Sequence, residues 1–193
     1  MVQEIYTHQK RKHWKVFPIE EMPKNTKILD SVWAMRRKRK IATGEISKYK
    51  ARLNAHGGQR VFGINYWETY APVVMWTTIR LIITLAKVNG WYSRQLDFVL
   101  AYPQAEIEGD IYMRLPKGFE LPNQQGKGKH CLRLLKNIYG LKQAGRVWNL
   151  HLHKGLIRLK YMQSKTDPCL YYQNNAMLAT YIDDCILIAK LRS

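Results

Sequence analysis

Hydrophobic residues follow two different spacings along the chain, one typical of helices and one typical of strands. In residues 77–89 apolar side chains recur at steps of three and four, and Gly90 follows the last turn, so this stretch predicts an amphipathic helix. A second apolar stripe of the same period, in residues 148–159, predicts another helix. Both stripes are explained by packing against a core.

Shorter apolar segments outside these two helices are rich in Val, Ile, Leu and Tyr, and they predict strands. The clearest strand segments are 31–35, 46–55, 93–102, 111–115, 132–134, 170–172, 176–180 and 185–189. Strands interspersed with two helices indicate an α+β domain.

Residues 31–40 and 46–55 flank a Thr43-Gly44 turn and predict a β-hairpin with many basic side chains. The basic run 36–40 is also compatible with a nuclear localisation patch, but its place on one arm of a hairpin favours contact with phosphate groups. Residues 1–27 are polar and basic, without a sustained period, and are interpreted as a lead-in or linker.

The charge balance points to a polyanionic partner. With 32 Lys+Arg against 14 Asp+Glu, the formal net charge is +18, and more than half of the excess lies in the first sixty residues. Nucleic acid is the first candidate, an anionic membrane surface is the second, and a basic surface that only confers solubility is the ordinary alternative.

The apolar runs, the first residues and the cysteines indicate which class of protein this is. No apolar run of about 18 residues is present, so we expect no membrane span, and the first residues lack the apolar core of a signal peptide. The three cysteines show no metal-ligand spacing and are interpreted as reduced core thiols of an intracellular protein.

Candidate chemistry lies in Tyr181-Ile182-Asp183-Asp184, between two apolar runs. Two adjacent carboxylates repel each other unless a cation lies between them, although a surface hairpin turn is the ordinary alternative. Asp97 is the single acidic residue on the predicted strand 93–102. A buried carboxylate there needs a hydrogen-bond partner, an opposite charge or a metal ion, and a satisfied structural aspartate stays open.

The order of these features, a basic hairpin, a lone aspartate on a strand and then an aspartate pair in a hairpin, resembles the reverse transcriptases of copia-type retrotransposons. Six local strings carry the resemblance: Lys50-Ala51-Arg52-Leu53, Tyr70-Ala71-Pro72-Val73-Val74, Gln95-Leu96-Asp97, Tyr112-Met113-Arg114-Leu115-Pro116-Lys117-Gly118-Phe119, Tyr139-Gly140-Leu141-Lys142-Gln143-Ala144 and Tyr181-Ile182-Asp183-Asp184.

The resemblance implies the fingers and palm subdomains of a right-hand polymerase. The fingers are expected at about 28–73 and 106–145, and the palm at about 74–105 and 146–193, after the lead-in 1–27. Because the chain stops shortly after Asp184, the thumb is expected to be absent and polymerase activity to be impaired.

The resemblance also implies an RNA-directed DNA polymerase that transfers a nucleotide from a dNTP to a primer 3′-hydroxyl. Two Mg²⁺ ions, with Mn²⁺ as a substitute, are expected as cofactors, because a hard cation prefers oxygen ligands. Asp97 and Asp183 are expected to hold them, with Asp184 as a supporting ligand and the backbone carbonyl of Phe98 as an additional one.

The remaining roles are carried over from the family. The expected nucleotide-binding residues are Lys50, Arg52, Tyr102 and Gln143, where Tyr102 excludes a ribose 2′-hydroxyl and Arg52 contacts the triphosphate. The expected primer and template contacts are Tyr181, Arg36, Arg37 and Lys38.

The expected partners are an RNA or DNA template-primer, dNTPs and the rest of a Pol polyprotein (thumb, RNase H, integrase), without a membrane. The expected location is intracellular, in a cytoplasmic virus-like particle or the nucleus. Two alternatives are weighed against a polymerase: a nucleic-acid-binding remnant without catalysis, and a nucleotidyltransferase that does not polymerise.

Overall fold

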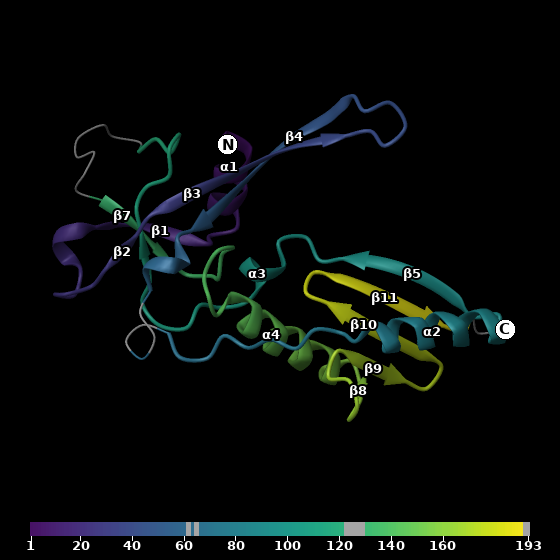
Figure 1. Cartoon of the computed structure of the whole chain (residues 1–193). Coiled ribbons are helices and arrows are strands. Elements are labelled where there is room, and N and C mark those ends of the chain that lie inside the picture. Colours follow the sequence, from purple (N-terminus) through teal and green to yellow (C-terminus); the bar gives the residue numbers. More distant parts are fainter. Residues whose placement is uncertain (61–62, 64–65, 122–129, 191–193) are drawn as a thin grey trace. The chain divides into compact units, whose positions relative to one another are not determined.

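The computed structural model describes residues 1–60, 63, 66–121 and 130–190 (Figure 1). The chain forms two compact units, each made from two separate stretches of sequence. Unit 1 comprises Met1–Trp67 and Ala105–Ala144, and unit 2 comprises Glu68–Gln104 and Gly145–Ser193. Both units contain helices and strands, so the α+β class expected from the sequence is confirmed.

Unit 1 contains a sheet with the strand order β1-β7-β6-β2. Strand β7 (His130–Leu134) lies between β1 (Trp14–Pro18) and β6 (Tyr112–Met113) and is antiparallel to both. The last strand, β2 (Ile28–Leu29), is parallel to β6. These strands are built largely from apolar residues, and Leu132 is fully buried among them.

The first 27 residues are ordered parts of unit 1 and differ from the lead-in that the sequence predicts. Helix α1 (Val2–Lys10) buries Ile5 and His8, strand β1 pairs with β7, and the 3₁₀ helix η1 (Ile19–Glu21) follows. The sequence shows no period here because α1 contributes only two buried side chains and β1 depends on a partner more than 100 positions away.

The predicted basic hairpin is confirmed as a long two-stranded ribbon of β3 (Ser31–Arg39) and β4 (Ile46–Ala55) in unit 1 (Figure 1). Gly44 in the turn has a φ of +70°, a conformation that glycine adopts without strain. Beyond β4 lies the 3₁₀ helix η2 (Gly57–Gln59). A Cβ atom on Gly140 would collide with the backbone of Ala55, so the Tyr139–Gln143 string needs glycine at this point.

Unit 2 contains an antiparallel sheet with the strand order β5-β11-β10-β9-β8. Its strands are β5 (Tyr92–Asp97), β11 (Asp184–Ala189), β10 (Ala176–Tyr181), β9 (Leu170–Gln173) and β8 (Met162–Gln163). Strands β10 and β11 form the hairpin that the sequence predicts around the aspartate pair, and this prediction is confirmed.

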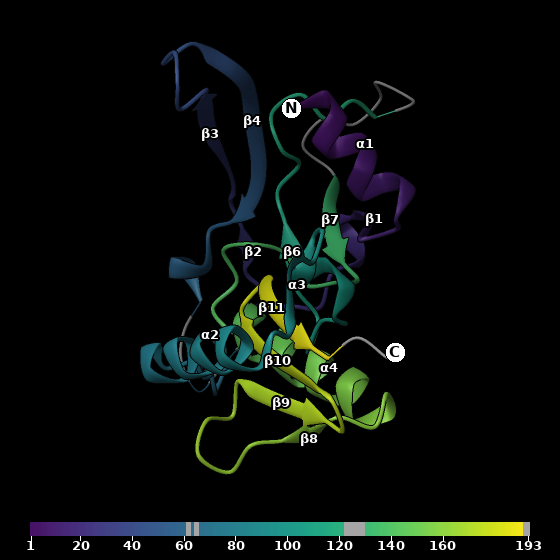
Figure 2. The same ribbon diagram turned by 90° about the vertical axis from the view of Figure 1, so that its right-hand side faces the viewer.

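Two helices cover opposite faces of this sheet (Figure 2). Helix α4 (Ala144–Arg158) packs Trp148, Leu152 and Leu156 against the face that carries Leu178 and Cys185. Helix α2 (Trp76–Asn89) packs Ile82 and Ala86 against the face that carries Ala179 and Ile188. Both helices occupy the predicted positions, and α2 ends at Gly90 with a φ of +64°.

Strand β5 is shorter than the sequence predicts. The expected strand 93–102 ends at Asp97, Leu100 adopts a positive φ of 54°, and Ala101–Gln104 form the short helix α3. As an edge strand that pairs only with β11, β5 exposes its side chains on both faces. The apolar alternation in the sequence continues to Tyr102, but β5 ends at Asp97 because its partner β11 begins at Asp184.

One expectation from composition is also met. All three cysteines are free and buried, as expected of core thiols. In the part of the chain that the structure describes, no helix has the length and apolar character needed to cross a membrane.

Candidate active site

Three aspartates come together at one end of the sheet of unit 2. Strands β5 and β11 pair so that Asp97 lies opposite Asp184. One residue after Asp97, the Phe98 amide donates a hydrogen bond to the Asp183 carbonyl oxygen at 2.8 Å. Hydrogen-bonded and non-hydrogen-bonded pairs alternate along an antiparallel ladder, so Asp97 and Asp184 form a non-hydrogen-bonded pair. Their side chains share a face, with Cβ atoms about 4.5–5.5 Å apart.

The turn that carries Asp183 is short. Tyr181 pairs with Asp184, which leaves Ile182 and Asp183 as the two central residues of the hairpin. Ile182 has a φ of 56°, a conformation that ordinarily calls for glycine and is an outlier for a β-branched residue. The buried Trp148 of α4 donates a hydrogen bond from its indole Nε1 to the Ile182 carbonyl oxygen at 2.6 Å.

The carboxylates are open to solvent. Asp97 and Asp184 are exposed and Asp183 is half-buried, so the sequence-based premise that Asp97 is buried is wrong. Its physical reason is the edge position of β5, which leaves Asp97 without a covering element. Within the described residues, no three His, Cys, Asp or Glu side chains are arranged to hold a metal ion. The backbone therefore brings the aspartates together, and their metal-ligand roles stay predictions.

A hollow of about 450 Å³ lies beside these aspartates, on the face of the sheet that α2 covers. Tyr181 and Asp184 line one part of it, and Ile79 and Ile83 of α2 line another. Tyr181, the expected primer contact, is half exposed at 50%. Unit 2 thus presents an aromatic ring and a carboxylate together at an accessible surface.

Tyr102 lies on helix α3 rather than on a strand, and it is half-buried. A Cβ atom built on Gly145, at the start of α4, would lie 3.8 Å from the Tyr102 hydroxyl, an ordinary van der Waals distance. The proposed role of Tyr102 in sugar selection stays a prediction.

In unit 1, the basic hairpin places like charges directly opposite one another. Arg36 pairs with Lys50 and Lys38 with Lys48, and side chains at these positions point to one face of the ribbon. Arg37 points to the other face, where it pairs with Tyr49. Opposed like charges destabilise a ladder, so this face favours a polyanion.

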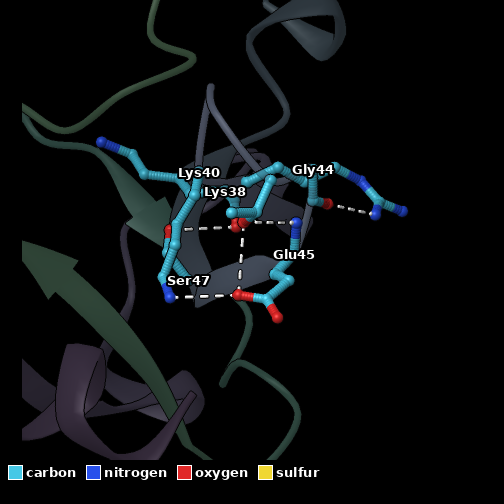
Figure 3. Close-up of polar contacts among 7 residues, drawn as sticks. Lys38, Lys40, Gly44, Glu45 and Ser47 are labelled. Carbon is cyan, nitrogen blue, oxygen red and sulfur yellow. Dashed lines mark hydrogen bonds and ion pairs between the residues drawn. The ribbon is translucent and has the colours of Figure 1, made fainter.

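The tip of the hairpin is held by a local network (Figure 3). Lys40 forms an ion pair with Glu45 at 3.1 Å, and the Ser47 hydroxyl donates to the Lys38 carbonyl oxygen at 3.1 Å. The Arg39 guanidinium donates to the Gly44 carbonyl oxygen at 2.8 Å. Two of the basic side chains are therefore occupied at the tip, whereas this network leaves the Arg36–Lys50 pair out.

The predicted nucleotide-binding residues of unit 1 have protein partners that the sequence does not reveal. The Arg52 guanidinium lies over the Tyr139 ring, 4.1 Å from its centroid. Gln143 is buried and its side-chain oxygen accepts a hydrogen bond from the Arg60 guanidinium. Burial lowers the pKa of Arg60 from its ordinary value. The structure thus gives Gln143 a structural contact, and its nucleotide-binding role stays a prediction.

Two further residues, Tyr66 and Lys142, were missed by sequence reasoning. The Lys142 ammonium donates to the Tyr66 hydroxyl at 2.8 Å, and Arg60 lies 5.7 Å from the centroid of the Tyr66 ring. Lys142 belongs to the Tyr139–Gln143 string that carries the resemblance, which was an available signal. Nothing in the local sequence marks Tyr66 or Arg60.

Comparison with known proteins identifies the family of this chain. Residues 14–192 match the family described as reverse transcriptase (RNA-dependent DNA polymerase), so the chain belongs to the reverse transcriptase family. Its relatives are Pol polyproteins of copia-type transposons, as the sequence predicts.

Three of these relatives show how far the likeness extends. The Pol polyprotein from transposon TNT 1-94 of Nicotiana tabacum is 33% identical over 98% of this chain, and that of transposon RE1 of Arabidopsis thaliana is 31% identical over 90%. The Gag-Pol polyprotein of transposon Ty1-ER2 of Saccharomyces cerevisiae is 28% identical over 85%. The chain spans only 14%, 12% and 9% of these relatives' lengths, respectively.

Proposed function

We propose that this chain is the fingers and palm portion of an RNA-directed DNA polymerase, with unit 1 as the fingers and unit 2 as the palm. One observation carries the proposal. In a chain of the reverse transcriptase family, the register of β5 and β11 places Asp97 opposite Asp184, beside the turn that holds Asp183. These residues are separated by more than 80 positions, so only the fold brings them together.

The chemistry of the donor atoms fits a divalent cation. Mg²⁺ prefers oxygen ligands, and the three aspartates supply only oxygen. Facing carboxylates on one side of a ladder repel each other, and a cation between them relieves that repulsion. Their exposure at the edge of the sheet leaves them accessible to metal ions and to a nucleotide.

In the proposed reaction, Asp97 and Asp183 would hold two Mg²⁺ ions, Asp184 would support them, and the Phe98 carbonyl oxygen would add a ligand. Such ions would activate the primer 3′-hydroxyl and neutralise the triphosphate. The contribution of the chain itself is to fix the carboxylates on a paired strand and a two-residue turn, because positioning supplies much of the rate in phosphoryl transfer.

The basic hairpin supports the binding of nucleic acid and nucleotide in this proposal. The face that carries Arg36, Lys38 and Lys50 contacts template or primer phosphates, which removes the repulsion between opposed cations. Arg52 keeps its guanidinium over Tyr139 and offers its free edge to the triphosphate. Tyr181 lines the hollow beside Asp184, where the primer terminus is proposed to lie, and Tyr102 excludes a ribose 2′-hydroxyl.

The relatives are much longer than this chain. We therefore also propose, as a separate point, that the chain acts as part of a whole Pol polyprotein. Its thumb, RNase H and integrase parts would act together with the two units. Assayed by itself, the 193-residue chain is expected to add only a few nucleotides per encounter, because contacts through exposed cations are weak at physiological salt.

The test is incorporation of dTMP by the purified chain on a poly(rA)·oligo(dT) template-primer, with Mg²⁺ or with EDTA. We expect short extension products that require Mg²⁺ and disappear in Asp183→Asn and Asp97→Asn. Asp110→Asn is the matched control, because Asp110 lies on unit 1 and forms an exposed ion pair with Arg133. Unchanged incorporation in Asp183→Asn would contradict the proposal.

One observation favours a second candidate, a nucleic-acid-binding protein without catalysis. Within the described residues no three potential metal-ligating side chains are clustered, whereas the basic face of the hairpin is fully formed. This candidate predicts salt-sensitive binding of the same template-primer without any incorporation by the wild-type chain. The assay above, combined with a binding measurement, separates the two.

A further inference from the structure

Trp148 of helix α4 contacts the turn that precedes Asp183. It is buried within the core that α4 forms against the sheet of unit 2, together with Ala101, Leu152 and Cys185. Packing alone explains a buried tryptophan, unless its indole N–H also forms a specific hydrogen bond, as it does in Trp148.

The indole Nε1 of Trp148 donates to the carbonyl oxygen of Ile182 at 2.6 Å. Ile182 immediately precedes Asp183 and has the positive φ of 56° that a β-branched residue ordinarily avoids. A conformation of this kind is strained and persists only where the surroundings hold it. The hydrogen bond fixes the carbonyl group of the strained residue itself.

The same side chain also contacts the strand end that carries Asp97. The Trp148 ring packs edge to face against Phe98, with ring centroids 5.2 Å apart and an interplanar angle of 68°. The Phe98 amide in turn donates to the Asp183 carbonyl oxygen at 2.8 Å. Trp148, Phe98 and the Ile182-Asp183 turn therefore form a closed ring of contacts, which links the end of β5, where Asp97 lies, to the turn that carries Asp183.

We propose that Trp148 is a positioning residue that holds the strained Ile182-Asp183 turn against the end of β5 and thereby sets the spacing between Asp183 and Asp97. For catalysis, the proposal rests on the polymerase function proposed above. The structural part, that the indole N–H maintains the turn, stands independently of it.

Two substitutions separate the hydrogen bond from the packing. Trp148→Phe keeps an aromatic ring beside Phe98 but removes the donor, so the Ile182 carbonyl group loses its partner. Ile182→Gly removes the strain, because glycine adopts a positive φ without cost. If Trp148 acts by holding a strained turn, the double variant Trp148→Phe, Ile182→Gly should keep the shape of the turn, because no strain remains for the hydrogen bond to oppose.

The first measurement is amide hydrogen exchange by NMR on the full chain. We expect Trp148→Phe to accelerate exchange of the Phe98 amide about tenfold or more, while the amide of Leu152, one turn further along α4, changes little. Trp91→Phe is the matched control, since Trp91 packs on the opposite face of the sheet against the α2 core. Equal acceleration at Phe98 and Leu152 would show that Trp148 acts only through packing and would overturn the proposal.

The second measurement is single-turnover incorporation of one dTMP. Trp148→Phe is expected to lower the rate constant by about 10- to 100-fold, as displacements near 1 Å do, with little change in the dTTP concentration for half-maximal rate. Adding Ile182→Gly to Trp148→Phe is expected to recover most of that loss. A double variant as slow as Trp148→Phe would overturn the positioning role.

The two measurements fail in different ways. A wild-type chain without incorporation contradicts the proposed function but leaves the exchange result to decide the role of Trp148. Incorporation by the wild type, with a normal rate in Trp148→Phe, contradicts the positioning role and leaves the polymerase proposal intact.

Discussion

His13 shows how burial of a single side chain makes the fold sensitive to pH. His13 is buried in unit 1, and its Nδ1 lies 2.9 Å from Nδ1 of the buried His8. Burial, helped by nearby His8, Arg11 and Lys136 and opposed by Glu4, lowers the pKa of His13 to about 4. The folded chain therefore keeps His13 neutral at a pH where the unfolded chain protonates it.

The consequence is a loss of stability in mild acid. Between pH 6.5 and about 4 the unfolded state binds more protons at His13 than the folded state, so the free energy of unfolding falls as the pH falls through this window. We expect a loss of at most about 3 kcal/mol, measured by urea unfolding at pH 7 and pH 4.5. His13→Gln should flatten that dependence, and an equally steep dependence in the variant would contradict the assignment.

Asp167 illustrates a residue whose role only the fold reveals. It is buried, and its carboxylate accepts hydrogen bonds from the amides of Met75 at 3.0 Å and Cys169 at 2.9 Å. Met75 is the N-cap residue of α2, whose own side chain forms no cap. A carboxylate from a distant loop thus serves the helix N-terminus.

We expect Asp167→Ala to lower the free energy of unfolding by about 1–3 kcal/mol, because two amides lose their acceptor in a buried site. Denaturant unfolding followed by circular dichroism measures this. The control is Asp110→Ala, whose exposed ion pair with Arg133 is worth about 0–1 kcal/mol. Equal losses in the two variants would contradict the capping role.

At the scale of elements, the β3–β4 hairpin links sequence to binding most directly. We expect the dissociation constant for an RNA–DNA duplex to rise steeply with salt, and the double variant Arg36→Gln, Lys50→Gln to reduce the log–log slope by about 1–2. Fluorescence anisotropy with a labelled duplex measures both. Lys87→Gln, an exposed lysine on α2, should leave the slope unchanged. A slope independent of Arg36 and Lys50 would remove this face from the interface.

Elements were predicted well where one local pattern determines them. The stripes of α2 and α4, the basic hairpin and the β10–β11 hairpin each follow from spacing or turn residues that lie within about 20 positions. The ends of β5 and the strand β1 were not predicted, because their limits depend on distant partners in β11 and β7.

The candidate site shows the same division at residue level. The aspartates were found because the motif names them, and the fold then explains how positions 97 and 184 become neighbours. Trp148, Arg60 and Tyr66 were not found as site residues, because their contacts join segments that nothing in the local sequence connects. Periodicity and charge in the sequence predict local elements and a charged surface. They do not predict which distant segments come into contact.

In the whole molecule, the residues proposed for nucleic-acid binding and those proposed for chemistry lie on different units. Unit 1 carries the opposed cations of the hairpin, and unit 2 carries the aspartates and the hollow beside them. Each unit is assembled from two separate stretches of the chain. A substitution that unfolds only unit 1 is therefore expected to impair nucleic-acid binding, and one that unfolds only unit 2 is expected to impair incorporation.

We expect Asp97, Asp183 and Asp184 to form one divalent-cation site, which paramagnetic broadening by Mn²⁺ can locate residue by residue. In ¹⁵N-labelled chain titrated with Mn²⁺, the amide signals of Asp97, Phe98, Asp183 and Asp184 should broaden first, and excess Mg²⁺ should restore them. Asp183→Asn should abolish this selectivity. Broadening that is uniform over the chain, or centred away from the end of β5, would contradict the account.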